Sequence, residues 1–233
     1  MSRFTTVYGD FSQRIQEVGV LRNKAAQFER SRESFTRGPE ISALCRGAVV
    51  LLSSHIEAYV KELGEHTLDE IHARGVCRSH LSPQFFYHMS KQTIDQIREA
   101  SRPETIATRV QGFVNHEAVF WSNLEPLPAP VPSEAFNKGF SNPTFKKVKS
   151  YFGRFGYRDY RRDLFRELGR DAQPTVNNLD QIVETRNSIA HGDPLATKTP
   201  AEILAMMNTA RKFCRASDKV FADWCKTNLC PIR

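Results

Sequence analysis

The sequence has 233 residues, of which 40% are hydrophobic and 25% are charged. A chain of this length buries roughly 70% of the surface that its unfolded form exposes, so it suits one domain, or one domain with an inserted arm. No stretch approaches the roughly 18 consecutive apolar residues of a membrane span, and the first residues lack the apolar core of a signal peptide. We therefore expect a single domain over residues 1–233, cytoplasmic and without membrane contact.

The net charge of +7 is concentrated in one segment. Residues 138–170 hold ten Lys or Arg side chains against three acidic ones, which accounts for the whole excess. The five cysteines form no C-x-x-C pair and the seven histidines are scattered. Since zinc sites usually show closely spaced Cys or His ligands, we expect reduced thiols, no metal and no cofactor.

Apolar residues recur at helical spacing from the N-terminus and predict an all-α fold, an antiparallel helical bundle with extra helices and a Pro-rich connecting loop. The first helix is predicted from Phe11 to Phe28, before Gly38-Pro39, and a longer one from Glu40 to Leu63. Shorter helices are expected over residues 85–100 and 104–124.

Four prolines then alternate with apolar residues between Pro126 and Pro132, which favours an extended linker within residues 126–143. Beyond it, the basic and aromatic segment 138–170 is predicted to form two short helices. Asn177 or Asn178 is a candidate N-cap for the next helix. Thr199 and Glu202 have the spacing of a capping box, with Pro200 between them, and predict the start of a long final helix.

The motifs of several reaction classes are missing. The sequence has no phosphate-binding P-loop, no nucleophile elbow and no H-E-x-x-H zinc motif. Near the C-terminus, however, it reads Arg186-Asn187-Ser188-Ile189-Ala190-His191-Gly192. An Arg and a His separated by four residues, with a polar residue after the Arg, resemble the active-site motif of HEPN ribonucleases.

A second patch, Val49 to Tyr59, is similar to the early apolar helix of the RiboL-PSP-type HEPN subgroup. The resemblance implies a metal-independent endoribonuclease that acts on RNA, with catalytic residues Arg186, Asn187 and His191. It also implies a homodimer whose facing motifs form a composite site. Small HEPN proteins commonly act as toxins or in antiviral or stress defence, so an antitoxin or another regulatory protein is a possible partner.

The chemistry of the two side chains agrees with this interpretation. A histidine titrates near neutrality and can act as base toward the ribose 2′-hydroxyl or as acid toward the leaving oxygen, while an arginine stabilises charge on the phosphate. Five positions along an ideal helix turn through about 140° and rise ~7.5 Å, so one straight helix does not aim both groups at one atom. Either the helix ends at His191, as Gly192 permits, or a second protomer supplies complementary groups.

Other roles for these residues stay open. Arg186 is an alternative surface ion-pair partner of Glu184 or Asp180, and His191 an ordinary helix cap. Glu57 is a possible supporting residue, although Lys61 lies one helical turn away. Asp193 either orients the imidazole or is a turn residue.

The basic segment is the predicted RNA-binding surface. Its aromatic residues are either base-stacking surfaces or core, with core favoured for Phe145, Phe152 and Phe155. The predicted phosphate contacts are Lys146, Lys147, Lys149, Arg158, Arg161 and Arg162. The alternative to an enzyme is a non-catalytic HEPN-like helical module that binds nucleic acid, a nucleotide or a nucleotidyltransferase partner.

Overall fold

The structure is a computed structural model that describes residues 4–32, 35–118, 120–121 and 125–233. Within these ranges the regular structure consists of helices, with one isolated bridge between Cys77 and Pro126. The predicted all-α fold is confirmed.

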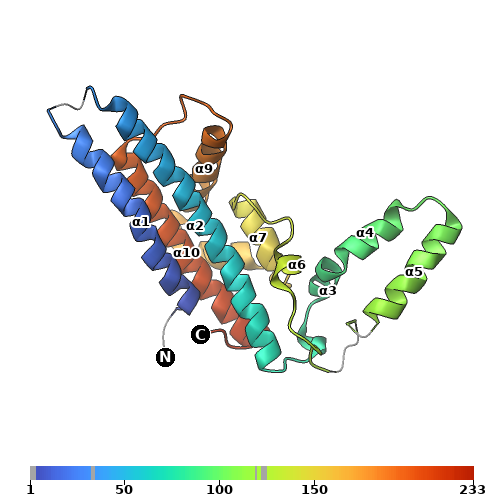
Figure 1. Cartoon of the computed structure of the whole chain (residues 1–233). Helices are drawn as coiled ribbons and strands as arrows, with labels where there is room; N and C mark the ends of the chain where they lie inside the picture. The colour runs from blue at the N-terminus through green and yellow to red at the C-terminus, as the bar shows by residue number, and fades with distance from the viewer. Residues whose placement is uncertain (1–3, 33–34, 119, 122–124) are drawn as a thin grey trace.

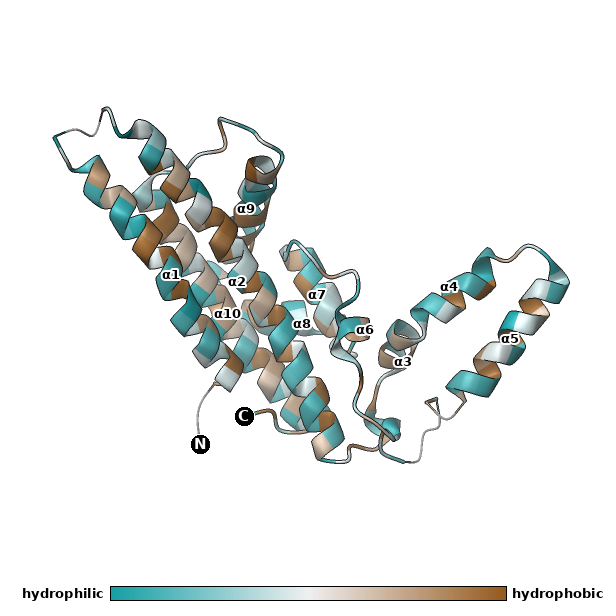
Figure 2. Cartoon of the chain, viewed as in Figure 1, coloured by the Kyte–Doolittle hydropathy of each residue, from teal (hydrophilic) through white to brown (hydrophobic). Residues whose placement is uncertain are grey.

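Three long helices form the body of the molecule: α1 (Thr6–Glu29), α2 (Gly38–Ala73) and α10 (Pro200–Asn228). Figure 1 shows α1 running opposite to both α2 and α10, with α9 (Ala172–Ala190) packed beside them. Figure 2 shows apolar residues along the helix faces that meet and polar residues on the outer faces. The fully buried side chains at the centre of this bundle include Phe11, Ile15, Val49, Leu52, Ile56, Leu63, Phe213 and Phe221.

Among the described residues, α2 has the length and apolar composition of a membrane-crossing helix, with a mean hydropathy of 1.3 over its best 18-residue window. Val49, Leu52 and Ile56 in its middle are nevertheless fully buried, and α2 packs against α1, α9 and α10. Packing inside the bundle accounts for the apolar character of α2.

An arm leaves the bundle after α2 and consists of η1 (Arg78–His80), α3 (Pro83–Met89), α4 (Lys91–Glu99) and α5 (Pro103–Glu117). The single helix predicted over residues 85–100 is two helices, because the buried Ser90 interrupts it. The Ser90 hydroxyl donates to Glu117 (2.9 Å) and accepts from the Trp121 indole (3.0 Å). The helix predicted over residues 104–124 ends at Glu117, and part of the predicted range lies outside the described residues.

The Pro-rich segment leads back to the bundle and is not extended throughout. It contains α6 (Ser133–Asn137), and its apolar residues Leu127 and Val131 are buried. The two predicted basic helices follow as α7 (Phe145–Gly153) and α8 (Tyr160–Leu168), before the short η2 (Gly169–Asp171).

The aromatic side chains of the basic segment are core residues. Phe145, Phe152 and Phe155 are buried as favoured, and Phe152 stacks on Phe221 of α10 with ring centroids 4.4 Å apart. Phe140, Tyr151, Tyr157 and Tyr160 are buried as well, and Phe165 is half-buried. The seven buried rings therefore offer no base-stacking surface in the folded chain.

The predicted cap at Asn177 or Asn178 is wrong, because α9 begins at Ala172 with Asp171 as its N-cap. Pro174 lies in the first turn of α9, where its missing N–H has no helical partner to lose. The capping box before α10 is confirmed, since Thr199 and Glu202 exchange both hydrogen bonds.

Candidate active site

The candidate site lies at the C-terminal end of α9. The helix ends at Ala190, His191 is its C-cap, and Gly192 has a φ of 82°. Two backbone hydrogen bonds close the end, from the Gly192 N–H to the Ile189 carbonyl (3.1 Å) and from the Asp193 N–H to the Ser188 carbonyl (3.0 Å). This is a Schellman motif, which glycine favours because it adopts positive φ without steric cost.

The His191 side chain is exposed at this helix end. Within the described residues it forms no side-chain hydrogen bond and no ion pair. The ring is therefore open to a ligand or a partner molecule from the solvent side. Anywhere among the residues that the structure describes, no group of three or more His, Cys, Asp or Glu side chains is placed to hold a metal ion.

Arg186 is half-buried one and a half turns before His191. Its Nη1 donates to the Oδ1 of Asn142 (3.0 Å) and to the Oδ1 of Asn187 (3.2 Å). Within the described residues it pairs with no carboxylate. The alternative ion pair with Asp180 is not formed there, because Asp180 instead accepts the Phe145 N–H at the start of α7 (2.7 Å). The guanidinium is thus held by two neutral amides, and its Nη2 and Nε donors are not engaged by described residues.

Asn142 is the residue that the motif search missed. It lies in the loop before α7 and has a φ of 54°, which is uncommon for a residue other than glycine. Its backbone N–H donates to Glu57 Oε2 (3.0 Å) while its side chain accepts from Arg186. A local signal for it exists in Asn142-Pro143, since Asn tolerates left-handed backbone and Pro marks a turn.

Glu57 reaches the site through Asn142. One carboxylate oxygen accepts from Lys61 Nζ (2.6 Å), which is the ordinary ion pair between helix turns, and the other accepts from the Asn142 backbone. α2, the loop before α7 and the end of α9 are therefore joined by one hydrogen-bonded chain from Glu57 through Asn142 to Arg186.

The contacts of Asp193 are those of a turn residue. Its Oδ1 accepts the Leu195 N–H (2.9 Å), and its carbonyl accepts from Arg46 of α2 (2.7 Å). Arg46 also donates to the Ala196 carbonyl (3.2 Å), so α2 holds the loop that follows His191. Within the described residues, no hydrogen bond joins the Asp193 carboxylate to the His191 ring.

The six predicted phosphate contacts are all exposed. Lys146, Lys149 and Arg158 line one open pocket of about 410 Å³ together with Tyr157. Arg162 is paired with Asp159 (3.1 Å) and Asp163 (3.0 Å). The other two also have local partners.

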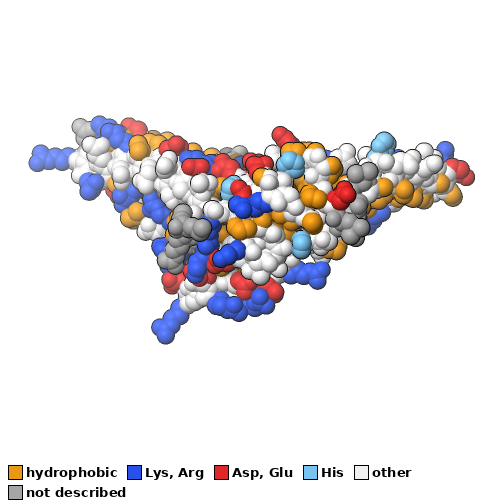
Figure 3. All heavy atoms as spheres, turned by 90° about the horizontal axis from the view of Figure 1, so that it is seen from below, with side chains coloured by type: hydrophobic (Ala, Val, Ile, Leu, Met, Phe, Trp, Pro, Cys, Tyr) orange, Lys and Arg blue, Asp and Glu red, His pale blue; other side chains and the backbone are white. Residues whose placement is uncertain are grey.

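Lys147 donates to the Ser141 carbonyl (2.8 Å), and the Arg161 guanidinium lies over the Phe165 ring at 5.1 Å. Figure 3, a view from below, shows Lys and Arg side chains interspersed with Asp and Glu over the bundle, and hydrophobic side chains along the arm. The structure thus brings together Lys146, Lys149 and Arg158, whereas the charge of Arg162 is already paired with two aspartates.

Comparison with known proteins places the chain in a family. The model of the RiboL-PSP-HEPN family matches residues 10–223, a range that contains Arg186, His191, Asn142, Glu57 and the basic segment. No curated protein and no solved structure gives a significant match. Because the family match spans most of the sequence, and the regular structure of the described residues is helical, the chain belongs to the RiboL-PSP-HEPN family.

Proposed function

We propose that this protein is a metal-independent endoribonuclease whose catalytic side chains are Arg186 and His191. The observation that carries the proposal is the charge of Arg186 and the way in which its side chain is held. Its charge is not neutralised by a carboxylate within the described residues, and two neutral amides fix it at the helix end that also bears His191. A guanidinium held by neutral amides keeps its full positive charge for a phosphate.

In the proposed reaction, His191 removes the proton of the ribose 2′-hydroxyl or protonates the leaving 5′-oxygen. The 2′-oxygen attacks the adjacent phosphorus, the bond to the 5′-oxygen breaks, and the products are a 2′,3′-cyclic phosphate and a 5′-hydroxyl. Arg186 donates its remaining N–H groups to the phosphate oxygens as negative charge builds up on them. Asn187 and Asn142 hold the guanidinium, and Glu57 holds Asn142.

The reaction needs an acid–base group and a positive charge at the same phosphate, but Arg186 and His191 are five residues apart and leave an ideal helix about 140° apart. We propose a homodimer in which a second copy brings its own Arg186 and His191 to a composite site. The exposed position of His191 supports this, because the ring has room for groups from another molecule. The proposed partners are RNA, a second copy of the chain and a regulatory protein such as an antitoxin, in a cytoplasmic toxin or defence setting.

A cleavage assay in excess EDTA tests the catalytic assignment. We expect Arg186→Ala and His191→Ala to abolish RNA cleavage. Two matched controls on the arm should cleave like the unmodified protein: Arg98→Ala, whose side chain is 72% exposed, and His116→Ala, which is also exposed. Cleavage that survives both motif substitutions would favour a non-catalytic binding module.

Mixing the two inactive variants tests the composite site. If Arg186 of one protomer works with His191 of the other, half of the dimers in an equal mixture are mixed dimers with one intact site of two. The mixture should then recover about a quarter of the normal rate. A mixture as inactive as its components would show that each site uses one protomer only.

Salt dependence tests the RNA-binding surface. Each cation that neutralises a phosphate releases counterions, so the affinity for RNA should fall steeply between 50 mM and 200 mM salt, as roughly expected for several phosphate contacts. Lys149→Ala should reduce this slope, whereas Arg162→Ala should not, because Arg162 is already paired with two aspartates. Equal slopes for the two variants would contradict the assignment.

A further inference from the structure

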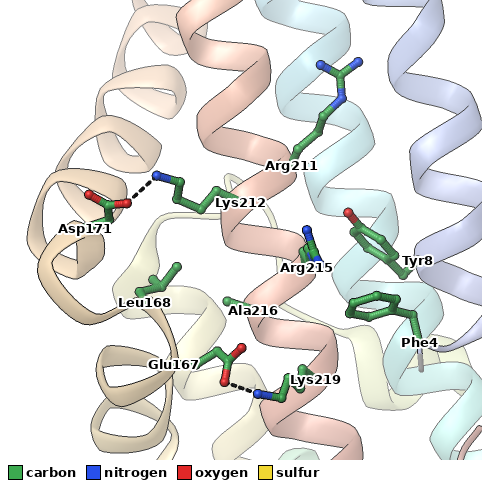
Figure 4. A pocket seen from close by; sticks show the side chains of 10 residues that line it. All are labelled: Phe4, Tyr8, Glu167, Leu168, Asp171, Arg211, Lys212, Arg215, Ala216 and Lys219. Atoms are coloured by element: carbon green, nitrogen blue, oxygen red, sulfur yellow. Dashed lines mark hydrogen bonds and ion pairs between the residues drawn. The ribbon is translucent and has the colours of Figure 1, made fainter.

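A second basic site lies at the opposite end of α9 from Arg186 and His191. It is a trough of about 460 Å³ between the start of α1, the junction of α8 with α9, and α10. Figure 4 shows α10 passing along its floor, with Phe4 and Tyr8 on one side and Glu167, Leu168 and Asp171 on the other. Since α9 has 19 residues, its length of about 28 Å separates Asp171 from His191.

Four cations from one stretch of α10 line this trough: Arg211, Lys212, Arg215 and Lys219. Lys212 pairs with Asp171 (2.6 Å), and Lys219 pairs with Glu167. Neither arginine has a carboxylate partner within the described residues. The lining therefore carries an excess of two positive charges, and both belong to guanidinium groups.

The arginines are held in place by neutral contacts. Arg211 Nη1 lies 3.5 Å from Asn208 Oδ1, and the Arg215 guanidinium lies 5.3 Å from the centre of the Phe4 ring. Being four residues apart on one helix, the two side chains leave the same face of α10. Their planar forks match the geometry of phosphate oxygens.

An aromatic wall stands beside the arginines. The rings of Phe4 and Tyr8 have centroids 5.1 Å apart, and Figure 4 shows both directed toward Arg215. The wall is fixed from inside the bundle. Thr5 donates from its backbone N–H (3.0 Å) and its hydroxyl to the fully buried Asp218, and its hydroxyl accepts the Tyr8 N–H (3.2 Å).

We propose that this trough binds a nucleotide, with the phosphate between Arg211 and Arg215 and the base against Phe4 and Tyr8. A phosphate monoester carries nearly two negative charges at neutral pH, which balances the excess of the lining. The volume lies within the range usual for small-ligand pockets, roughly 300–1,000 Å³. The nucleotide has two possible sources, a free nucleotide or the terminal nucleotide of an RNA strand. The inference does not rest on the proposed cleavage reaction.

Binding measurements on the full chain test the proposal. Isothermal titration calorimetry at low salt would compare adenosine 5′-monophosphate, inorganic phosphate and adenosine. Two 2′-O-methyl oligonucleotides, one with a 5′-phosphate and one without, represent the strand end and resist cleavage. Saturable binding of the monophosphate identifies a free nucleotide as ligand. If the 5′-phosphorylated oligonucleotide binds and neither the monophosphate nor the unphosphorylated oligonucleotide does, the ligand is a strand end. Each of these two results supports the proposal.

Variants distinguish the trough from the rest of the surface. Arg211→Ala and Arg215→Ala should each weaken the binding at least tenfold, whereas Arg98→Ala on the arm removes the same charge and should have no effect. Phe4→Ala should weaken the nucleotide at least about fivefold, the lower end for base stacking. Phe35→Ala is the matched control, because Phe35 is 98% exposed.

Two results would overturn the proposal. The first is the absence of saturable binding of both the monophosphate and the 5′-phosphorylated oligonucleotide. The second is binding that persists in the Arg211→Ala, Arg215→Ala double variant, whose circular dichroism melt reports whether it is folded. Binding that is lost in Arg186→Ala but kept in the double variant would place the ligand at the candidate active site instead.

Discussion

Replacing Asn142 by Gly probes the contact that holds Arg186. The substitution removes the Oδ1 that accepts from the guanidinium at 3.0 Å, and it keeps the backbone N–H that donates to Glu57. Because the φ of Asn142 is 54°, Gly adopts the same backbone without strain. Ala at this position would add a steric cost of about 1–2 kcal/mol, so the loss of the side-chain contact could not be told apart from backbone strain.

The size of the expected effect follows from the geometry. A hydrogen bond to a charged group contributes about 1.5–3 kcal/mol. Since Asn187 still accepts from the same Nη1, we expect the lower end of this range, which is about a tenfold loss of cleavage rate.

Single-turnover cleavage at saturating protein separates this effect on the chemical step from one on binding. A thermal melt is the control for folding. An unchanged rate, or a loss of rate accompanied by an equal loss of RNA affinity, would refute the idea that Asn142 positions Arg186.

Three further predictions concern stability, each measured as the change in thermal midpoint and in free energy of unfolding. Gly64→Ala should destabilise the fold by about 1–3 kcal/mol through overpacking, because a Cβ at this position would collide with the Tyr151 hydroxyl. The Tyr151 ring lies between Phe136 and Phe140 and has little room to move. An unchanged thermal midpoint would mean that the ring can move. Asp218→Ala leaves the two Thr5 donors buried and unpaired, so it should lower the free energy of unfolding by about 1–3 kcal/mol for each donor. A smaller loss of stability would mean that water reaches these donors. Burial lowers the pKa of His55 and of His88, which lies beside Arg154, so the fold holds fewer protons than the unfolded chain below about pH 6.5. Stability should therefore fall with pH below that point, by at most about 1.4 kcal/mol per pH unit for each histidine, and less in His55→Gln and His88→Gln; equal pH dependence in these variants would show that other groups control it.

The sequence predicted the middle of each long helix because the signals are local, although α1 begins five residues before Phe11 and α2 continues ten residues past Leu63. The apolar spacing of α1 and α2 and the capping box at Thr199 and Glu202 lie within a few residues of the structure that they specify. The break at Ser90 was not predictable in this way, since its hydroxyl bonds to Glu117 and Trp121 about thirty residues later. Likewise, burial of the aromatic residues in the basic segment depends on α10, as with Phe152 against Phe221.

The candidate site likewise contains residues that the sequence predicts and one that it does not. Arg186, Asn187 and His191 are adjacent on one helix end, so a motif finds them. Asn142 lies 44 residues before Arg186 and joins the site only because the loop before α7 folds against α2 and α9. The tolerance of asparagine for left-handed backbone and the following Pro143 are weak local signals, and neither shows which side chain Asn142 contacts.

No sequence motif predicted the trough lined by Arg211 and Arg215 either, because its walls come from three parts of the chain. On a helix, two arginines four residues apart are ordinary surface residues. Only the fold shows that Phe4 and Tyr8 stand beside them and that the neighbouring lysines are already paired.

The most direct test of the central claim is cleavage of an RNA that carries a single 2′-deoxy nucleotide. A preferred cut is first mapped in excess EDTA, and the ribose on the 5′ side of that cut is then replaced by deoxyribose. The proposed mechanism predicts a 2′,3′-cyclic phosphate at the original cut and complete loss of that cut in the substituted RNA. Cleavage of the substituted RNA at the same position, or a product with a 5′-phosphate, would contradict attack by the 2′-hydroxyl and the roles assigned to Arg186 and His191.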